Sequence, residues 1–108
     1  MSRNIKFRFL LAPIVVALLV VTSPVAWAGE LEDAQEAVRQ NPNDADTHHT
    51  LGDIYYNLDR YQEAIASYKE VVRIDPNNAK AHHRLGVAYI SVGQKEDAVT
   101  FYKEATRI

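Results

Sequence analysis

The feature that most constrains the fold of this chain is its self-similarity at an offset of 34 residues. With this offset, Leu51-Gly52 coincides with Leu85-Gly86, and Tyr55 coincides with Tyr89. Further coincidences pair Pro42 with Pro76, His48-His49 with His82-His83, Ala64 with Ala98, and Tyr68 with Tyr102. A fixed period of this length indicates a repeat array, in which each unit buries its apolar face against its neighbours.

Each unit is predicted to be a pair of helices, at residues 45–58 and 61–74 and again at 79–92 and 95–108. Leu51, Ile54, Tyr55 and Leu58 recur at helical spacing. The turns carry residues that start and stop helices: Asn43-Asp44 offers a cap, Asp75-Pro76 ends a helix, and Gly93 suits a left-handed turn. Gly52 and Gly86, inside helices, indicate points where the paired helices approach closely.

The spacing Leu51-Gly52-x-x-Tyr55, Ala64-x-x-x-Tyr68, Pro76 resembles the tetratricopeptide repeat, and so does Leu85-Gly86-x-x-Tyr89, Ala98-x-x-x-Tyr102. The resemblance implies an all-α fold of antiparallel helix-turn-helix repeats, stacked as a short right-handed α-solenoid. The expected segments are a half-repeat helix (about 30–40) and linker at 29–44, unit 1 at 45–78 and a C-terminally incomplete unit 2 at 79–108.

Two features depart from the family pattern. His48 and His82 stand where the family often has Trp, and we expect them to pack between helices. No polar capping helix follows residue 108, so apolar surface is expected around Val99, Tyr102 and Ile108. This end therefore leaves two alternatives to a free-standing module: a truncated piece of a longer array, or an array that forms homo-oligomers through its uncapped end.

The resemblance implies a binding site in the concave groove, which in this family holds extended peptides or partner helices. The groove positions of this chain are Asp46, His49, Thr50, Asp53, Tyr56, Asn57, Lys80, His83, Arg84, Val87, Ile90 and Ser91. Lys80 and Arg84 share a helix face and resemble half of the family's clamp for a carboxylate. A full clamp is not expected, because Asp53 on the facing helix would repel an acidic ligand.

Residues 1–28 have the three parts of a secretory signal peptide. Arg3, Lys6 and Arg8 precede the apolar run at 9–21, and Ala26-Trp27-Ala28 fits signal peptidase, with cleavage before Gly29. The alternative is an uncleaved membrane anchor over residues 9–29. The sequence therefore predicts export to a periplasmic, lumenal or secreted location.

Composition excludes several function classes. With no Cys, the chain has no disulfide, thiolate zinc site or cysteine nucleophile. All 14 acidic residues lie after residue 28, so the body is acidic and unsuited to nucleic-acid phosphates. No phosphate-binding loop or nucleophile motif is present, so no enzymatic activity and no cofactor are expected. Adjacent His side chains diverge by about 100° on a helix, which leaves metal binding as a weak alternative. We expect a non-enzymatic scaffold with an unidentified protein or peptide partner.

Overall fold

The computed structural model describes residues 25–108, which form five α-helices and, within that range, no strand. The helices are α2 (Val25–Gln40), α3 (Ala45–Asn57), α4 (Tyr61–Ile74), α5 (Ala79–Ser91) and α6 (Lys95–Arg107). The predicted signal segment, as far as residue 24, lies outside the described residues. Among the helices that are described, none combines the length and the apolar character needed to cross a membrane.

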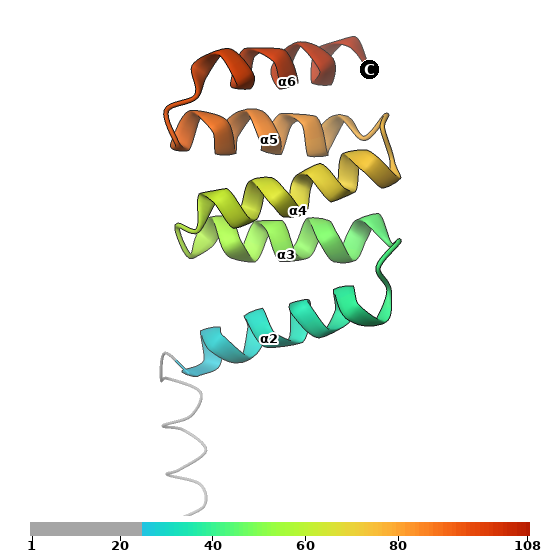
Figure 1. The fold of residues 1–108 in the computed structure, drawn as a ribbon, viewed down its shortest axis with the longest axis vertical. Coiled ribbons are helices and arrows are strands. Elements are labelled where there is room, and N and C mark those ends of the chain that lie inside the picture. The colour runs from blue at the N-terminus through green and yellow to red at the C-terminus, as the bar shows by residue number, and fades with distance from the viewer. Residues whose placement is uncertain (1–24) are drawn as a thin grey trace, which may run out of the picture. The chain divides into compact units, whose positions relative to one another are not determined.

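The chain divides into two compact units, residues 1–30 and residues 31–108. Of the first unit, the structure describes residues 25–30, which begin α2. The second unit holds the rest of α2 and two helix hairpins, α3–α4 and α5–α6, whose helices stack in chain order with neighbours antiparallel (Figure 1). The all-α helix-turn-helix architecture expected from the 34-residue period is confirmed.

The turns between units use side-chain caps at equivalent positions. The side chain of Asp44 accepts a hydrogen bond from the Asp46 backbone N–H at 2.9 Å, and Asn78 Oδ1 accepts one from Ala81 N–H at 3.0 Å. Each bond satisfies a backbone donor that the first turn of a helix leaves unpaired. Within the hairpins, α4 and α6 begin without a side-chain cap. The entry into each unit is therefore fixed by a cap, and the turn inside each unit is fixed by its backbone conformation.

The helices lie close to their expected positions. α4 has the expected bounds, while α3, α5 and α6 each end one residue earlier than expected. Leu58 and Val92 instead act as C-caps, and their backbone N–H groups close the last turn. α2 starts at Val25, before the expected residue 30, and ends at Gln40 as expected. The differences of one residue at the ends of α3, α5 and α6 fall where helix limits are ordinarily least defined, whereas α2 begins five residues earlier than expected.

The core lies along α4, which packs against both α3 and α5. Ala64, Tyr68 and Val71 on α4 are fully buried, as is Leu85 on α5. Burying an aliphatic side chain the size of Val71 or Leu85 stabilises a fold by about 1.5–3 kcal/mol. α2 joins the same core through Ala34, with Leu31 and Val38 packed against it. Residues 31–40 thus pack against the first hairpin, as the half-repeat helix expected from the sequence would.

The two units differ in how far their second helices are covered. Ile65 on α4 is 4% exposed, whereas Val99, its equivalent on α6, is 50% exposed. Tyr68 has no exposed surface, and its equivalent Tyr102 is half-buried. The difference arises because α5 covers α4, while no helix among the described residues follows α6. The apolar surface expected around Val99, Tyr102 and Ile108 is therefore present.

Candidate interaction surface

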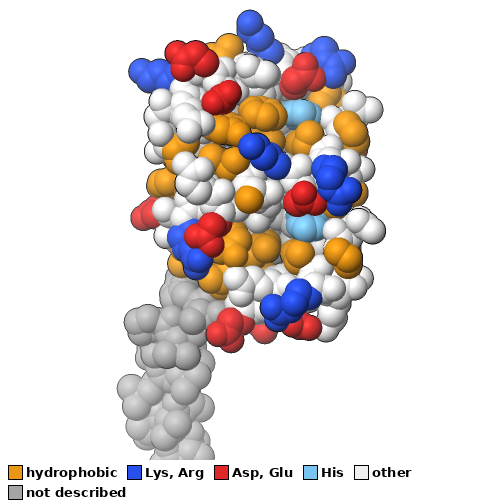
Figure 2. Space-filling model, in the orientation of Figure 1, with side chains coloured by type: hydrophobic (Ala, Val, Ile, Leu, Met, Phe, Trp, Pro, Cys, Tyr) orange, Lys and Arg blue, Asp and Glu red, His pale blue; other side chains and the backbone are white. Residues whose placement is uncertain are grey.

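The groove residues expected from the repeat pattern lie on α3 and α5, the first helices of the two units. They differ in exposure: Asp46, Thr50, Asn57, Lys80, His83, Ile90 and Ser91 are exposed, and His49, Asp53, Tyr56, Arg84 and Val87 are half-buried. Space-filling representation shows hydrophobic side chains gathered over α3 and over α5, with side chains of both charges between them (Figure 2). We name these exposed and half-buried groove residues of α3 and α5 the groove surface.

Asp53 is the centre of a polar network on the groove surface. Tyr68 Oη donates a hydrogen bond to Asp53 Oδ1 at 2.5 Å. His49 Nδ1 lies 3.3 Å from Asp53 Oδ2, and Arg84 Nε lies 3.6 Å from Asp53 Oδ1. The carboxylate of one unit therefore binds its own second helix through Tyr68 and the next unit through Arg84. The last contact is a partly exposed ion pair and contributes at most about 1 kcal/mol.

This network bears on the expectation for Arg84. The sequence suggested that Lys80 and Arg84 form half of a carboxylate clamp, with Asp53 nearby as a charge that repels an acidic ligand. In the structure Arg84 is already paired with Asp53, at 3.6 Å. A carboxylate ligand would have to displace Asp53, which Tyr68 also holds. Lys80 makes no ion pair within residues 25–108 and remains the more available cation.

The His49 ring lies over the edge of Tyr68, with ring centroids 5.6 Å apart. Burial of this ring lowers the pKa of His49, and the cations Lys80 and Arg84 lower it further, while Asp53 and Asp46 oppose the shift. Its Nε2 atom is buried and has no hydrogen-bond partner among the described residues. The burial of His49 therefore favours the neutral form of its ring, whose Nδ1 faces the Asp53 carboxylate.

The two units also meet through Tyr56 and Ser91. Their hydroxyl oxygens lie 3.1 Å apart, and Ser91 also donates to the Val87 carbonyl at 3.1 Å. The Tyr56 ring packs against Tyr61 at the start of α4, with centroids 5.1 Å apart. Tyr56 is thereby held from both sides, and its half-exposed ring is part of the groove surface.

The second unit lacks the polar network of the first. Val87 takes the place of Asp53, so Tyr102 has no equivalent carboxylate partner. His83, equivalent to His49, is exposed and packs on Tyr102 with ring centroids 5.5 Å apart. The groove surface therefore carries the acidic residues and the polar network on α3, and basic and aliphatic side chains on α5.

His48 and His82 pack between helices as expected, with 7% and 5% of their surfaces exposed. Their hydrogen bonds could not be predicted from the sequence. His48 Nε2 lies 2.8 Å from the Pro42 carbonyl oxygen, and His82 Nε2 lies 2.9 Å from that of Pro76. Each ring thus joins the start of its unit to the preceding turn. Within residues 25–108 the structure brings together no group of three or more side chains suited to a metal ion.

Sequence reasoning placed Tyr68 in the core alone and missed its role at the groove surface. Its ring is buried, but its hydroxyl reaches Asp53, and burial together with this hydrogen bond raises the pKa of the phenol. A usable signal was present, because an acidic residue follows Gly52 in the first unit and a valine follows Gly86 in the second. Only the three-dimensional structure shows that this difference changes the partner of the tyrosine.

Stacked antiparallel helix pairs with a shared side-chain surface define an α-helical repeat protein. Three family models agree with this class: the "TPR repeat" family matches residues 52–93, and two families described as "Tetratricopeptide repeat" match residues 33–66 and 79–108. Residues 33–108 are therefore tetratricopeptide repeats.

Solved structures of MamA have a similar fold. One crystal structure of MamA is 28% identical, with a TM-score of 0.69, over 71% of this chain and 45% of that one. The MamA AMB-1 structure is 27% identical, with a TM-score of 0.72, over 76% of this chain and 48% of its own. The MamA MSR-1 structure is 26% identical, with a TM-score of 0.72, over 87% and 53% respectively. This chain thus spans about half the length of these MamA chains. No curated protein sequence matches it significantly.

Proposed function

We propose that this protein is a non-enzymatic scaffold that acts outside the cytoplasm and binds a peptide or partner helix on its groove surface. The repeat matches and the MamA neighbours support a protein–protein interaction module. Binding on the groove surface, export from the cytoplasm and a non-enzymatic role are proposed here in addition.

The observation that carries the proposal is that side chains of both units meet on the groove surface. Asp53 meets Arg84, and Tyr56 meets Ser91, so α3 and α5 present one continuous surface. Ile90 is part of this surface and has 51% of its own surface exposed, although it is a large apolar residue. A surface with a rigid aromatic edge, an exposed aliphatic side chain and a polar margin is typical of a protein-binding site.

The chemistry of this surface favours a ligand with apolar side chains and a backbone that needs hydrogen-bond partners. Thr50 and Asn57 on α3 are exposed and carry a hydroxyl and an amide. Ile90 and Val87 on α5 supply apolar contact. A strongly acidic ligand is less suitable, because Asp53 lies in the middle of the surface.

Location outside the cytoplasm follows from the sequence of residues 1–28, with its basic start, apolar run and Ala26-Trp27-Ala28 ending. If this segment is removed as we propose, the exported protein begins at Gly29. The partner would then be a periplasmic, lumenal or secreted protein.

The proposal is tested by affinity purification of the full-length chain, tagged after Ile108, from the extracytoplasmic fraction of its own cell. Ile90→Arg changes the groove surface, and Val99→Arg is its matched control, since the two residues are 51% and 50% exposed. We expect one dominant partner with the wild type and with Val99→Arg, its loss with Ile90→Arg, and an N-terminus at Gly29. A partner retained by Ile90→Arg would reject the groove surface as the binding site.

A second candidate function is self-association through α6, which the exposure of Val99 favours. Stacking of a second copy on α6 would bury Val99 and Tyr102 as α5 buries Ile65 and Tyr68. In the purification described above, this candidate predicts recovery of untagged copies of the same chain, with their loss in Val99→Arg. Light scattering that gives a monomer mass at high concentration would reject it.

A further inference from the structure

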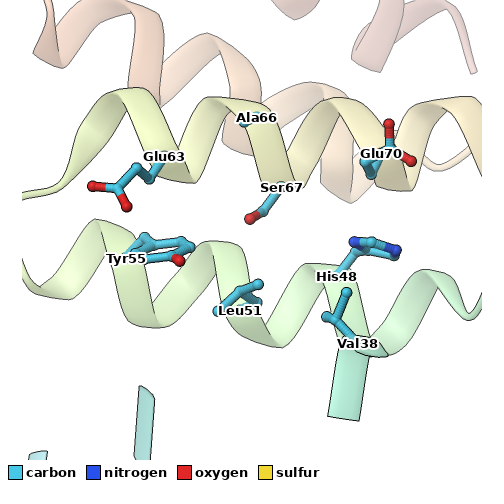
Figure 3. Close-up of a pocket in the computed structure, with 8 residues that line it drawn as sticks. All are labelled: Val38, His48, Leu51, Tyr55, Glu63, Ala66, Ser67 and Glu70. Atoms are coloured by element: carbon cyan, nitrogen blue, oxygen red, sulfur yellow. The ribbon is translucent and has the colours of Figure 1, made fainter. Parts of the chain in front are cut away.

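A pocket of about 300 Å³ lies between α2, α3 and α4, away from the groove surface. Its lining includes Val38, His48, Leu51, Tyr55 and Ser67. Ser67 on α4 points toward α3, between the rings of Tyr55 and His48 (Figure 3). The lining also includes exposed Ala66 and half-buried Glu63 and Glu70, so the pocket opens at the surface.

Comparison with the equivalent position of the second unit indicates which side chain fits this pocket. Ser67 is equivalent to Phe101 at the 34-residue offset. The Phe101 ring stacks on Tyr89, with centroids 5.4 Å apart and planes within 5°, and on His82 at 6.0 Å. Tyr89 and His82 are the equivalents of Tyr55 and His48, which line the pocket. In the first unit the two aromatic walls are therefore present, and the phenyl ring between them is missing.

The walls of the pocket are fixed before any ligand arrives. His48 Nε2 lies 2.8 Å from the Pro42 carbonyl oxygen, the same contact that holds His82 at Pro76. The Tyr55 hydroxyl accepts a hydrogen bond from Gln35 Nε2 at 2.9 Å, and the Arg60 guanidinium lies 5.0 Å from the Tyr55 ring centroid. A pocket with pre-positioned walls loses little entropy on binding.

The volume sets the size of the occupant. A dry apolar cavity of about 150 Å³ already accepts benzene, whereas drug-sized ligands fill pockets of roughly 300–1,000 Å³. An open pocket of about 300 Å³ therefore has ample room for one aromatic side chain and lies at the lower limit for a drug-sized ligand or cofactor. A second copy of this chain is an unsuitable ligand for the pocket, because Phe101 is the single phenylalanine of residues 25–108 and packs in its own unit.

We propose that the pocket between α2, α3 and α4 is a second docking site, which takes a phenylalanine side chain of a partner protein in the position that Phe101 occupies one unit later. This site goes beyond the proposed function and is independent of it. Its residues His48, Leu51 and Tyr55 occupy a different face of α3 from His49, Asp53 and Tyr56. The chain would thus hold partners on two faces.

The experiment titrates the full-length chain with the peptide acetyl-Gly-Phe-Gly-amide and follows backbone amide signals by NMR. The alanine peptide acetyl-Gly-Ala-Gly-amide is the control ligand. We expect saturable shifts at residues 48–55 and 63–70 with the phenylalanine peptide only. Ser67→Phe should fill the pocket from within and weaken the affinity at least tenfold. Phe101→Ser is the matched opposite variant and should create a second responding region at residues 82–89 and 97–104.

Other outcomes overturn the proposal. Equal affinity in Ser67→Phe and the wild type, or equal shifts with the alanine peptide, would show that the pocket does not take the ring. Binding of toluene without binding of the peptide would assign the site to a free small molecule. Shifts that grow with protein concentration alone and vanish in Ser67→Phe would assign it to a second copy.

Ser67→Leu, which adds a smaller side chain, replaces Ser67→Phe if that variant does not unfold cooperatively. The groove variant Ile90→Arg should leave every one of these titrations unchanged.

Discussion

Gly52 and Tyr68 meet so closely that only a residue without a side chain fits at the first position. A Cβ atom on Gly52 would lie 2.6 Å from Cε1 of Tyr68 and 2.8 Å from its Cδ1. The ring cannot retreat, because Tyr68 is fully buried and its hydroxyl is bound to Asp53. The same contact recurs between Gly86 and Tyr102, where the corresponding distance is 2.7 Å. The glycine thus sets the distance between the two helices of each unit.

We therefore predict that Gly52→Ala destabilises the protein despite the higher helix propensity of alanine. Overpacking costs about 1–3 kcal/mol, and the gain in propensity offsets about 1 kcal/mol of it. Gly86→Ala should cost less, because Tyr102 is only half-buried and can turn outward. Urea denaturation of both variants measures the difference. An equal loss in the two units would contradict the role given to the buried Tyr68 ring.

The backbone conformation of the turn between α3 and α4 leads us to predict that a glycine at residue 59 stabilises the protein. Asp59 has a φ of 59°, and its equivalent Gly93 between α5 and α6 has a φ of 81°. This left-handed conformation costs an ordinary residue about 1–2 kcal/mol. Asp59→Gly should therefore raise the free energy of unfolding by about 0.5–1 kcal/mol, and Gly93→Ala should lower it by about 1 kcal/mol.

Asp59→Gly also removes a side-chain hydrogen bond, between Tyr61 and Asp59, and Tyr61→Phe is the control for that loss. Tyr61 Oη donates to Asp59 Oδ1 at 2.9 Å on the exposed surface. Tyr61→Phe removes this bond and keeps the backbone, so its thermal unfolding isolates the contribution of the bond. A fall in stability for Asp59→Gly larger than for Tyr61→Phe would contradict the backbone argument.

Because burial lowers the pKa of His49, we predict that the protein loses stability at acidic pH. Burial lowers its pKa in the folded protein below the ordinary value of about 6.5, so the unfolded chain takes up a proton more readily. The contribution of the neutral ring is complete above about pH 6.5 and is lost as the pH falls below it. Unfolding measured between pH 7.5 and 5.5 should show a decreasing free energy. The decrease should be smaller in His49→Gln, and an unchanged slope would reject this assignment.

Asp53 predicts the ligand preference of the groove surface. Its charge pairs with Arg84 and opposes an acidic ligand. The Coulomb energy of two like charges about 4 Å apart lies between about 1 kcal/mol in water and about 4 kcal/mol near a protein surface. Asp53→Asn should raise the affinity for acetyl-Gly-Gly-Asp-Asp about tenfold, since 1.4 kcal/mol corresponds to that factor. Arg84→Ala in the same background should remove the gain. Calorimetry that finds equal affinity in wild type and Asp53→Asn would exclude Arg84 as a carboxylate site.

Much of the fold could be predicted because the 34-residue offset fixes which residues are equivalent. Gly52, Tyr68 and their equivalents gave the helix pairs, and Pro76 and Gly93 gave their limits. The turn at residues 59–60 was predicted, but the left-handed backbone of Asp59 was not, since aspartate there gives no signal as plain as glycine. The hydrogen bond from Tyr68 to Asp53 was missed because the repeat pattern assigns the tyrosine to the core.

The pocket at Ser67 could not be predicted from either unit alone. A serine inside a helix is unremarkable, and only the rings stacked on Phe101 in the other unit show what the space can hold. The pairing of Arg84 with Asp53 likewise depends on the distance between α3 and α5, which a spacing pattern does not give. Functional differences between repeats therefore lie in the residues that the period does not repeat.

The central claim is that the groove surface binds a partner protein. The most direct test places a photo-reactive benzophenone amino acid at Ile90 and, in a second sample, at Val99, which is equally exposed on α6. Full-length protein is irradiated in its own cells, and the adducts are identified by mass spectrometry. The account predicts an adduct of Ile90 with one dominant extracytoplasmic protein and no such adduct at Val99. No adduct at Ile90, or adducts from Val99 alone, would contradict it.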